Sequence, residues 1–243
     1  MKKILIYLFI WLFSVSAFAA NYRSVDSRAE RVPRQYDESL PKLVSYLIEP
    51  FKDNEEKKAR VLMAWIVYHI DYDDYKADTI TNSAYRRSKR NKVAMSGDIF
   101  QTRVGVCEDI ANLYQRMAGL AGLDSVVISG YAGFNVNRKN MAESRHAWNA
   151  VKIDGKWEFV DPTWAIQGAG VKAFEDVGSK LAHKREIKKR TQNANKTNKS
   201  RKNRVVDDRW FMTKPRDMIE THYPDDETWQ LLPVPKKMGR FLK

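Results

Sequence analysis

The chain has 243 residues, 43% of them hydrophobic and 12% aromatic, and a formal net charge of +13. That length suits one domain with a hydrophobic core, or at most two, and the composition is ordinary for a globular protein. The single cysteine excludes an internal disulfide. No stretch after residue 20 is apolar enough to span a membrane.

Residues 1–19 have the pattern of a secretory signal peptide. Two lysines precede an apolar run from Ile4 to Phe18, and Ala17-Phe18-Ala19 has the small-x-small form that signal peptidase cleaves. We therefore expect cleavage after Ala19 and export to the bacterial periplasm or beyond. An uncleaved membrane anchor is the alternative, because the run approaches the lower limit for a span.

The region after the signal begins with charged, aperiodic sequence. Residues 20–36 predict a flexible lead-in, and residues 37–243 are expected to form the domain. Apolar residues at helical spacing predict one helix within 39–51 and a second behind Asn54, which is a candidate N-cap. The acidic and aromatic residues 71–78 predict a loop.

The middle of the chain predicts a helix followed by extended strands. Apolar residues recur at i, i+3, i+4 and i+7 within 107–120, as on one face of a helix. Extended runs follow at 125–131, 146–153 and 156–160, and the last two flank Asp154-Gly155, a strong hairpin signal. The expected fold class is therefore α+β, with the cysteine-bearing helix packed on an antiparallel β-sheet.

A basic segment interrupts the domain. Lys180 to Arg204 contains eleven Lys and Arg residues and one acidic residue, a net charge of +10, and the rest of the exported chain is near neutral. This composition predicts a disordered insertion at 178–206. It could attract an anionic envelope or membrane surface, or be a solvated loop without a partner. Nucleic acid is not the expected partner, because the segment has no aromatic residues for base stacking.

Cys107 is placed where a thiol becomes reactive. It follows Gly105-Val106 at the predicted start of a helix. Unpaired backbone N–H groups and the helix dipole favour an anion at that position, so the pKa of the thiol falls and the thiolate forms more readily. The pattern predicts a nucleophile, and the alternative is a small, buried, apolar residue.

The predicted hairpin brings a base close to an acid. With a two-residue loop at Asp154-Gly155, facing residues have numbers that sum to 309, so Trp148 faces Asp161 and His146 faces Thr163. His146 and Asp161 are then diagonal neighbours on one face, with Cβ atoms at most about 7–8 Å apart. An imidazole and a carboxylate at that separation can form a hydrogen bond.

These residues suggest a Cys-His-Asp triad. Cys107 would attack an acyl carbon, His146 would hold the thiol proton and later pass it to the leaving group, and Asp161 would fix the imidazole tautomer. The Cys107 backbone N–H and the side chain of Gln101 are candidate donors to the oxyanion. An exposed polar residue in a loop explains Gln101 equally well.

The remaining aromatic and histidine residues give weaker signals. Trp148 and Trp164 flank the triad strands and are candidates for the cleft wall or for the core. His69, His183 and His222 are scattered in the sequence, and one cysteine is too few for a structural zinc site. No Gly-rich phosphate loop appears. We therefore expect no metal and no cofactor, and a structural role for His222.

Three segments resemble the catalytic blocks of the transglutaminase-like superfamily. They are Gly-Val-Cys-Glu-Asp-Ile-Ala-Asn-Leu at 105–113, His-Ala-Trp-Asn-Ala-Val at 146–151 and Val-Asp-Pro-Thr-Trp at 160–164. The tail at 210–232 resembles the kyphoscoliosis-peptidase branch. The resemblance spans roughly 55–232 and implies a papain-like core with the triad on Cys107, His146 and Asp161. The basic insertion is longer than in that branch, so its role is not carried over.

The expected function is that of an exported thiol enzyme. The resemblance implies cleavage or transfer of peptide or isopeptide-type amide bonds through an acyl-thioenzyme intermediate. Because the superfamily also contains inactive scaffolds, a binding module that uses the same cleft is the alternative. We expect a monomer with a peptide or protein substrate. The sequence leaves open whether water or an amine accepts the acyl group.

Overall fold

The structure is a computed structural model that describes residues 22–73, 77, 98–167 and 204–243. The predicted signal peptide and almost all of the predicted basic insertion lie outside the described residues. Within the described ranges, no helix combines the length and the hydrophobicity needed to cross a membrane.

The described chain begins with consecutive helices and continues with a mixture of strands and helices. Residues 22–30 are helical, and the later elements are η1 (Arg34–Tyr36), α2 (Leu40–Ile48), η2 (Glu49–Phe51), α3 (Glu55–His69), β1 (Asp71–Tyr72), α6 (Ile99–Thr102), β2 (Val104–Gly105), α7 (Cys107–Leu120), β3 (Ser125–Ala132), β4 (Arg145–Ile153), β5 (Lys156–Val160), α8 (Pro162–Gln167), η5 (Asp208–Trp210), β6 (Phe211–Thr213), α11 (Pro215–Met218), β7 (His222–Pro224), η6 (Glu227–Gln230) and α12 (Met238–Phe241).

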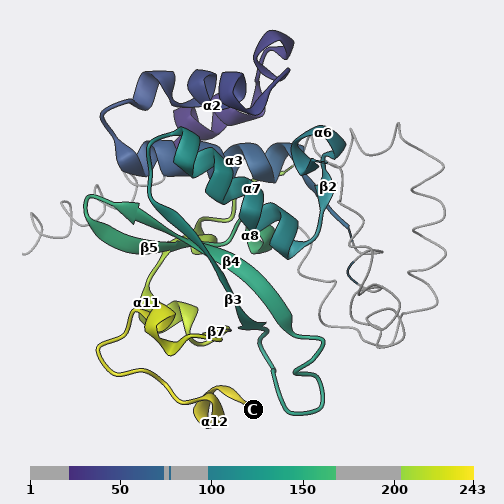
Figure 1. Cartoon of the computed structure of the whole chain (residues 1–243), viewed down its shortest axis with the longest axis vertical. Helices are drawn as coiled ribbons and strands as arrows, with labels where there is room; N and C mark the ends of the chain where they lie inside the picture. The colour runs from purple at the N-terminus through teal and green to yellow at the C-terminus, as the bar shows by residue number, and fades with distance from the viewer. Residues whose placement is uncertain (1–21, 74–76, 78–97, 168–203) are drawn as a thin grey trace, which may run out of the picture.

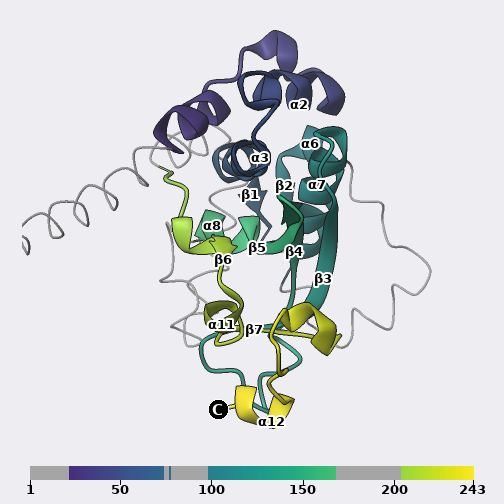
Figure 2. The same cartoon turned by 90° about the vertical axis from the view of Figure 1, so that its left-hand side faces the viewer.

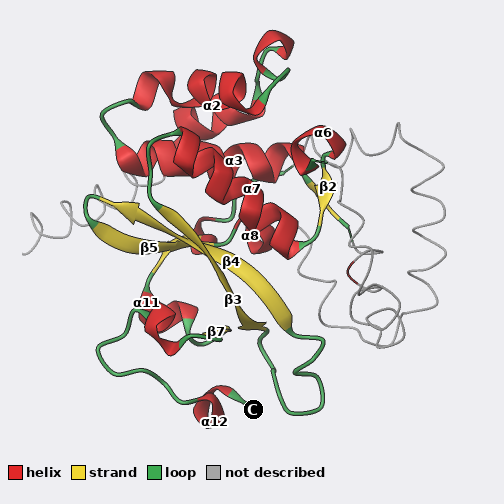
Figure 3. Ribbon diagram, in the orientation of Figure 1, coloured by secondary structure: helices red, strands yellow, loops and turns green. Residues whose placement is uncertain are grey.

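These elements form an α+β fold, as the sequence predicts. The strands β6-β5-β4-β3-β7 form, in this order, an antiparallel sheet, and α2, α3 and α7 gather on one side of it (Figures 1 and 3). The main hydrophobic core joins residues of these helices to residues of the sheet. The perpendicular view shows α11 and α12 at the opposite end of the molecule from α2 (Figure 2).

The cysteine helix α7 forms for the reasons that its sequence predicts. Its apolar face, which includes Ile110, Tyr114 and Met117, is fully buried. At its start the Asp109 carboxylate accepts a hydrogen bond from the Val106 backbone N–H at 3.1 Å. The buried Asn149 side chain of β4 donates to the Ala111 carbonyl of α7 at 3.0 Å. The helix is therefore held directly against the strand that begins at Arg145.

The hairpin between β4 and β5 has the predicted register over its length. Asp154 and Gly155 both adopt positive φ angles, 49° and 80°, as a type I′ turn requires. Ile153 pairs with Lys156, and the pairing continues to Asn149 and Val160. Beyond Val160 the chain leaves the ladder and enters α8. The predicted pairings of Trp148 with Asp161 and of His146 with Thr163 are therefore not formed.

The predicted flexible lead-in is wrong for residues 22–36. Tyr22, Val25 and Ala29 are buried in the main core, and Asp26 forms an ion pair with Arg60 of α3 at 2.8 Å. Three apolar residues among many charged ones are too few to produce a clear helical period in the sequence. Packing against α3 supplies the stabilisation that the segment lacks on its own.

Two further boundaries differ from the sequence prediction. Asp71 and Tyr72, predicted to lie in a loop, belong to β1, which pairs in parallel with β2. Arg204 donates to the carbonyls of Val67 and Ile70 at the C-terminal end of α3 and also pairs with Asp71. It satisfies carbonyls that the helix itself leaves unpaired. Residues 204–206 therefore belong to the fold and not to the basic insertion.

Candidate active site

Cys107 is the first residue of α7 and is half-buried. Burial opposes ionisation of its thiol, but the hydrogen bond and positive charge of His146 outweigh that effect and lower the pKa of Cys107. The Ala147 backbone N–H donates to the same sulfur. Strand β5 pairs with β4 only as far as Asn149, so residues 145–148 of β4, which include His146, are not paired with β5.

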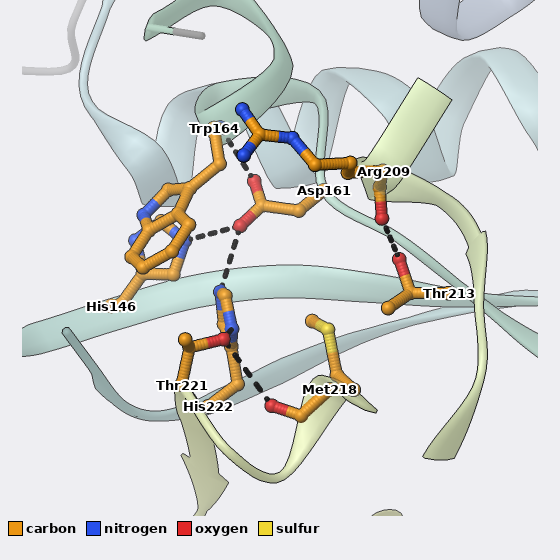
Figure 4. A network of polar contacts seen from close by, with 8 residues as sticks. All are labelled: His146, Asp161, Trp164, Arg209, Thr213, Met218, Thr221 and His222. Atoms are coloured by element: carbon orange, nitrogen blue, oxygen red, sulfur yellow. Dashed lines mark hydrogen bonds and ion pairs between the residues drawn. The ribbon is translucent and has the colours of Figure 1, made fainter. Parts of the chain in front are cut away.

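His146 lies near the start of β4, with only 8% of its side chain exposed. Its Nε2 is 2.8 Å from Oδ2 of Asp161 (Figure 4). Burial opposes the charged imidazole, but the negative charge and hydrogen bond of Asp161 outweigh it and raise the pKa of His146 to about 10. Since Nε2 is engaged by the carboxylate, Nδ1 is the ring nitrogen left for the Cys107 thiol.

Asp161 is fully buried at the junction of β5 and α8. Its Oδ2 accepts from His146 and from His222 Nε2 at 3.0 Å, and its Oδ1 accepts from the Trp164 backbone N–H at 3.0 Å. Burial opposes ionisation, but the positive charge and hydrogen bond of His146, followed by the hydrogen bond of His222, hold the pKa of Asp161 well below its usual range. The carboxylate is charged and has donors on both oxygens.

Hydrogen bonds join the three side chains in series, from Cys107 to His146 and from His146 to Asp161. The charged imidazole of His146 lies between the Cys107 thiol and the Asp161 carboxylate, and it favours ionisation of both neighbours. A thiol whose pKa is lowered in this way ionises more readily, and the imidazole beside it can carry a proton.

The predicted tryptophans both lie against this site. Trp148 is buried and its ring stacks on His146, with centroids 6.0 Å apart and planes 17° apart. Trp164 is half-buried, 6.0 Å from the His146 ring and 5.5 Å from the ring of Phe134, which is 51% exposed. Trp148 therefore packs against the imidazole inside the core, whereas Trp164 lies between the imidazole and the exposed ring of Phe134.

Gln101, the predicted oxyanion donor, lies on α6 and is exposed. Within the described ranges its side chain makes no hydrogen bond. α6 and β2 precede Cys107 directly in the chain. Its role stays a prediction.

His222 is the residue of the site that the sequence interpretation missed. It belongs to β7, is fully buried, and bonds directly to Asp161. It stood in an aromatic, acidic stretch that suggested only a structural role. The resemblance of the tail to the kyphoscoliosis-peptidase branch was the one sequence feature that pointed to this segment, and it assigned no function to His222.

The same residues are the described group that could hold a metal ion. Ligand atoms of His146, Asp161 and His222 lie within 4.8 Å of one another. Direct hydrogen bonds of 2.8 and 3.0 Å already join them, so an ion would have to displace the two ring protons that make these contacts. These hydrogen bonds account for the arrangement of the three side chains.

Comparisons with known proteins agree with this architecture. Residues 42–162 match the family model described as the transglutaminase-like superfamily. Kyphoscoliosis peptidase from Homo sapiens is 28% identical over 231 residues, which cover 94% of this chain and 29% of that protein. Hillarin from Drosophila melanogaster is 28% identical over 239 residues, covering 94% of this chain and 25% of hillarin. The chain spans less than a third of the length of these relatives.

Among solved structures, the periplasmic domain of TgpA from Pseudomonas aeruginosa is similar. It has 18% sequence identity and a TM-score of 0.40 over 62% of this chain and 50% of that chain. A structure described as a TGase has 17% identity and a TM-score of 0.39 over 72% of this chain and 42% of that one.

The matched region runs from α2 to the first residue of α8 and includes Cys107, His146 and Asp161. The two kyphoscoliosis peptidases, at 28% and 29% identity, are consistent with the branch that the tail resembles. By its matched domain and its relatives, this chain belongs to the transglutaminase-like superfamily.

Proposed function

We propose that this protein is a thiol-dependent acyl-transfer enzyme that acts on peptide or isopeptide-type amide bonds. Cys107, His146 and Asp161 are its triad. One observation carries this function: a single imidazole is hydrogen-bonded both to the Asp161 carboxylate, at 2.8 Å, and to the Cys107 thiol. That arrangement supplies the nucleophile, the proton carrier and the fixed acceptor that thiol-based acyl transfer needs.

In the first half-reaction the Cys107 thiolate attacks the amide carbonyl carbon. A C–S bond forms and the carbonyl oxygen becomes an oxyanion. The Cys107 backbone N–H, at the first position of α7, is a candidate donor to that oxyanion, and Gln101 is a second. His146 passes its proton to the amide nitrogen, the C–N bond breaks, and the amine leaves.

In the second half-reaction the acyl-thioenzyme is resolved. His146, now neutral, takes a proton from water or from an amine as that nucleophile attacks the thioester carbon. The C–S bond breaks, and the Cys107 thiolate and the His146 imidazolium are restored. Throughout both steps Asp161 keeps Nε2 protonated and the ring in place, so that Nδ1 faces the sulfur.

The substrate class rests on the chemistry and on the relatives. A thiol nucleophile with a proton carrier suits an acyl group whose leaving group must be protonated, as an amide nitrogen must. Kyphoscoliosis peptidase, at 28% identity over 94% of this chain, bears the name of a peptidase. We therefore assign peptide-type amides as the substrate and leave the acceptor to the experiment.

The test uses a peptide pool of mixed sequence, with and without a biotinylated primary amine. Mass spectrometry detects new peptide termini, which report hydrolysis, and biotin-labelled peptides, which report transfer. We expect product in at least one of the two channels, and none from Cys107→Ala or from protein treated with iodoacetamide. Undiminished product from Cys107→Ala would contradict the mechanism. Tight peptide binding without any product would instead favour the non-catalytic binding module.

We also propose that the chain is exported and that its basic insertion binds an anionic envelope surface. Residues 1–19 have the signal pattern, and Lys180 to Arg204 has a net charge of +10. N-terminal sequencing of the periplasmic or secreted form should begin near Ala20. Deletion of 178–203 should weaken binding to anionic vesicles in a salt-sensitive way and leave turnover of a small soluble peptide nearly unchanged.

A further inference from the structure

The second histidine on Asp161 is not explained by the triad. His222 is fully buried on the edge strand β7, and its Nε2 lies 3.0 Å from the same Oδ2 that accepts from His146. It is packed among tryptophan rings, with Trp164 at 4.5 Å and Trp148 at 5.1 Å between centroids. Figure 4 shows both histidines directed at one carboxylate from different sides.

The hydrogen bonds determine which tautomer His222 adopts. Burial lowers the pKa of His222 to about 4, so the ring is neutral at neutral pH and has one N–H. The ionised Asp161 can only accept, so that proton is on Nε2. Nδ1 must therefore accept, and the Thr221 hydroxyl, 2.8 Å away, donates to it. The same hydroxyl is 3.4 Å from the Met218 carbonyl, a longer and weaker contact.

Charge separates the roles of the two histidines. His146 carries a proton and shares it with the thiol, whereas His222 stays neutral until the pH falls to about 4. The titratable groups that act on His222 are Asp161 and His146, and the remaining ring neighbours are tryptophans. His222 is therefore a permanent donor that does not compete for the proton that moves.

The backbone holds His222 in this position. Strand β7 pairs with β3 through Gly130 and Pro224, and through Ala132 and His222. A Cβ atom on Gly130 would lie 2.2 Å from the Tyr223 carbonyl oxygen and 2.8 Å from the Trp148 ring. Only glycine lets β7 approach closely enough to bring its histidine to the carboxylate.

We propose that His222 is a positioning residue: its Nε2–H fixes the Asp161 carboxylate so that it faces His146, and Thr221 orients the ring. Together with the Trp164 backbone N–H on Oδ1, it prevents the carboxylate from rotating away. This role rests on the proposed function, because only that reaction uses the proton on His146. Its physical effect, the ionisation of Cys107, can be measured without any substrate.

The test compares two amide substitutions at one position. In His222→Gln the amide reaches about as far as Nε2 and can still donate to Asp161, whereas in His222→Asn it reaches only the position of Nδ1. The readout is the rate of iodoacetamide alkylation between pH 3 and pH 9. Because the chain has one cysteine, all label reports Cys107. The acid limb of this profile gives the pKa of the thiol.

We expect His222→Asn to move the acid limb upward by about one pH unit, equivalent to roughly tenfold slower alkylation below the midpoint. A carboxylate that has rotated away no longer supports the charged imidazole, so the thiolate loses its counter-ion. His222→Gln should stay within about twofold of the wild type, since it keeps the donor. In triads of this kind, loss of the carboxylate that orients the histidine lowers turnover severely.

The matched control is Gln230→Leu. Gln230 is also buried, at 2% exposure, and its side chain bonds to the backbone of Lys236 and to the Tyr223 side chain. No hydrogen bond of the described residues joins it to the triad or to His222. It should lower the melting temperature and leave the alkylation profile unchanged.

Three results would be decisive. A folded His222→Asn with the wild-type acid limb would overturn the positioning role. An equal shift in His222→Gln and His222→Asn would also overturn it, because loss of packing would then explain the effect. A wild-type midpoint near the ordinary cysteine pKa of about 8.5 would overturn the proposed function itself.

Discussion

The molecule contains two buried charge clusters that look alike in outline and differ in one respect. In the first, Arg60 of α3 is 1% exposed and bonds Asp26 through Nε and Nη2, both at 2.8 Å, while Nη2 also pairs with Asp208 at 2.6 Å. In the second, Asp161 is fully buried and accepts from His146 and His222. Each cluster stabilises one buried charge with several hydrogen bonds.

The difference is whether a proton can move. Burial opposes the charge of Arg60, but its aspartate partners raise its pKa further, and a guanidinium does not deprotonate in proteins. Its neighbours include the ring of Tyr22, 4.6 Å from the guanidinium carbon. The Asp161 cluster instead ends at an imidazole that shares its proton with a half-buried thiol. A buried ion becomes part of a reactive site when one partner can give up a proton.

The largest expected effect comes from Asp161→Asn. An amide keeps the shape of the carboxylate but removes its charge and gives the neighbouring imidazole the wrong partner. We expect turnover to fall about 10³–10⁴-fold, with the fold retained. Steady-state kinetics on the peptide found in the pool assay measure this. A reduction of only a few-fold would mean that the Asp161 cluster is structural, like the cluster at Arg60.

The equivalent change in the other cluster is Arg60→Met, which should act on stability alone. It leaves Asp26 and Asp208 without their counter-ion, at a cost of about 2–3 kcal/mol in unfolding free energy. The value lies below the roughly 3–5 kcal/mol typical of a fully buried ion pair, because the Asp26 and Asp208 side chains are 18% and 64% exposed and solvent screens them. Urea unfolding measures this loss. Turnover per folded molecule should stay within about twofold of the wild-type value. A large fall in turnover would show that the Arg60 cluster is coupled to the Asp161 cluster.

The third prediction concerns pH. The pKa of His222 falls from its ordinary 6.5 to about 4 on folding. Below pH 6.5 the unfolded chain therefore binds a proton that the folded chain does not, so stability decreases as pH falls, until the folded pKa is reached. Between pH 6.5 and pH 5 this amounts to roughly 1–2 kcal/mol of unfolding free energy.

The measurement requires a background without the thiol. The pKa of Cys107 is also lowered in the folded chain, which gives a second pH-dependent contribution of the same sign, and Cys107→Ala removes it. Urea unfolding of Cys107→Ala should show the acid-side loss, and Cys107→Ala with His222→Gln should lack it. Equal slopes in the two proteins would show that His222 takes up a proton in the folded state, unlike a permanent neutral donor.

The smallest effect separates stability from reactivity. Gly119 lies in α7, and a Cβ built on it meets nothing within 4 Å. Gly119→Ala should raise the unfolding free energy by about 0.5–1 kcal/mol through helix propensity and a less flexible unfolded chain. The alkylation profile of Cys107 should not change. A shift in that profile would show that the reactivity of the thiol depends on the stability of its helix as well as on its partners.

Local patterns in the sequence were enough for much of the fold, and they singled out three residues that the structure brings together at the candidate site. The apolar spacing of α7 predicts its face, and Cys107 does begin that helix. The Asp154-Gly155 turn predicts the register of β4 and β5, which holds as far as Val160. Asp161 then meets His146 from the junction with α8. These features depend on residues that are near one another in the chain, where helical period and turn geometry constrain the backbone directly.

Only the tertiary structure decided what surrounds those residues. His222 is 61 residues from Asp161 in sequence, and it arrives because β7 pairs with β3, beyond the basic insertion. The helix at residues 22–30 and the position of Arg204 likewise depend on packing against α3. Such contacts join distant segments through the shape and burial of the whole core. These contacts leave no periodic pattern in the sequence, because the position of each segment is stabilised only when the other segment is already in place.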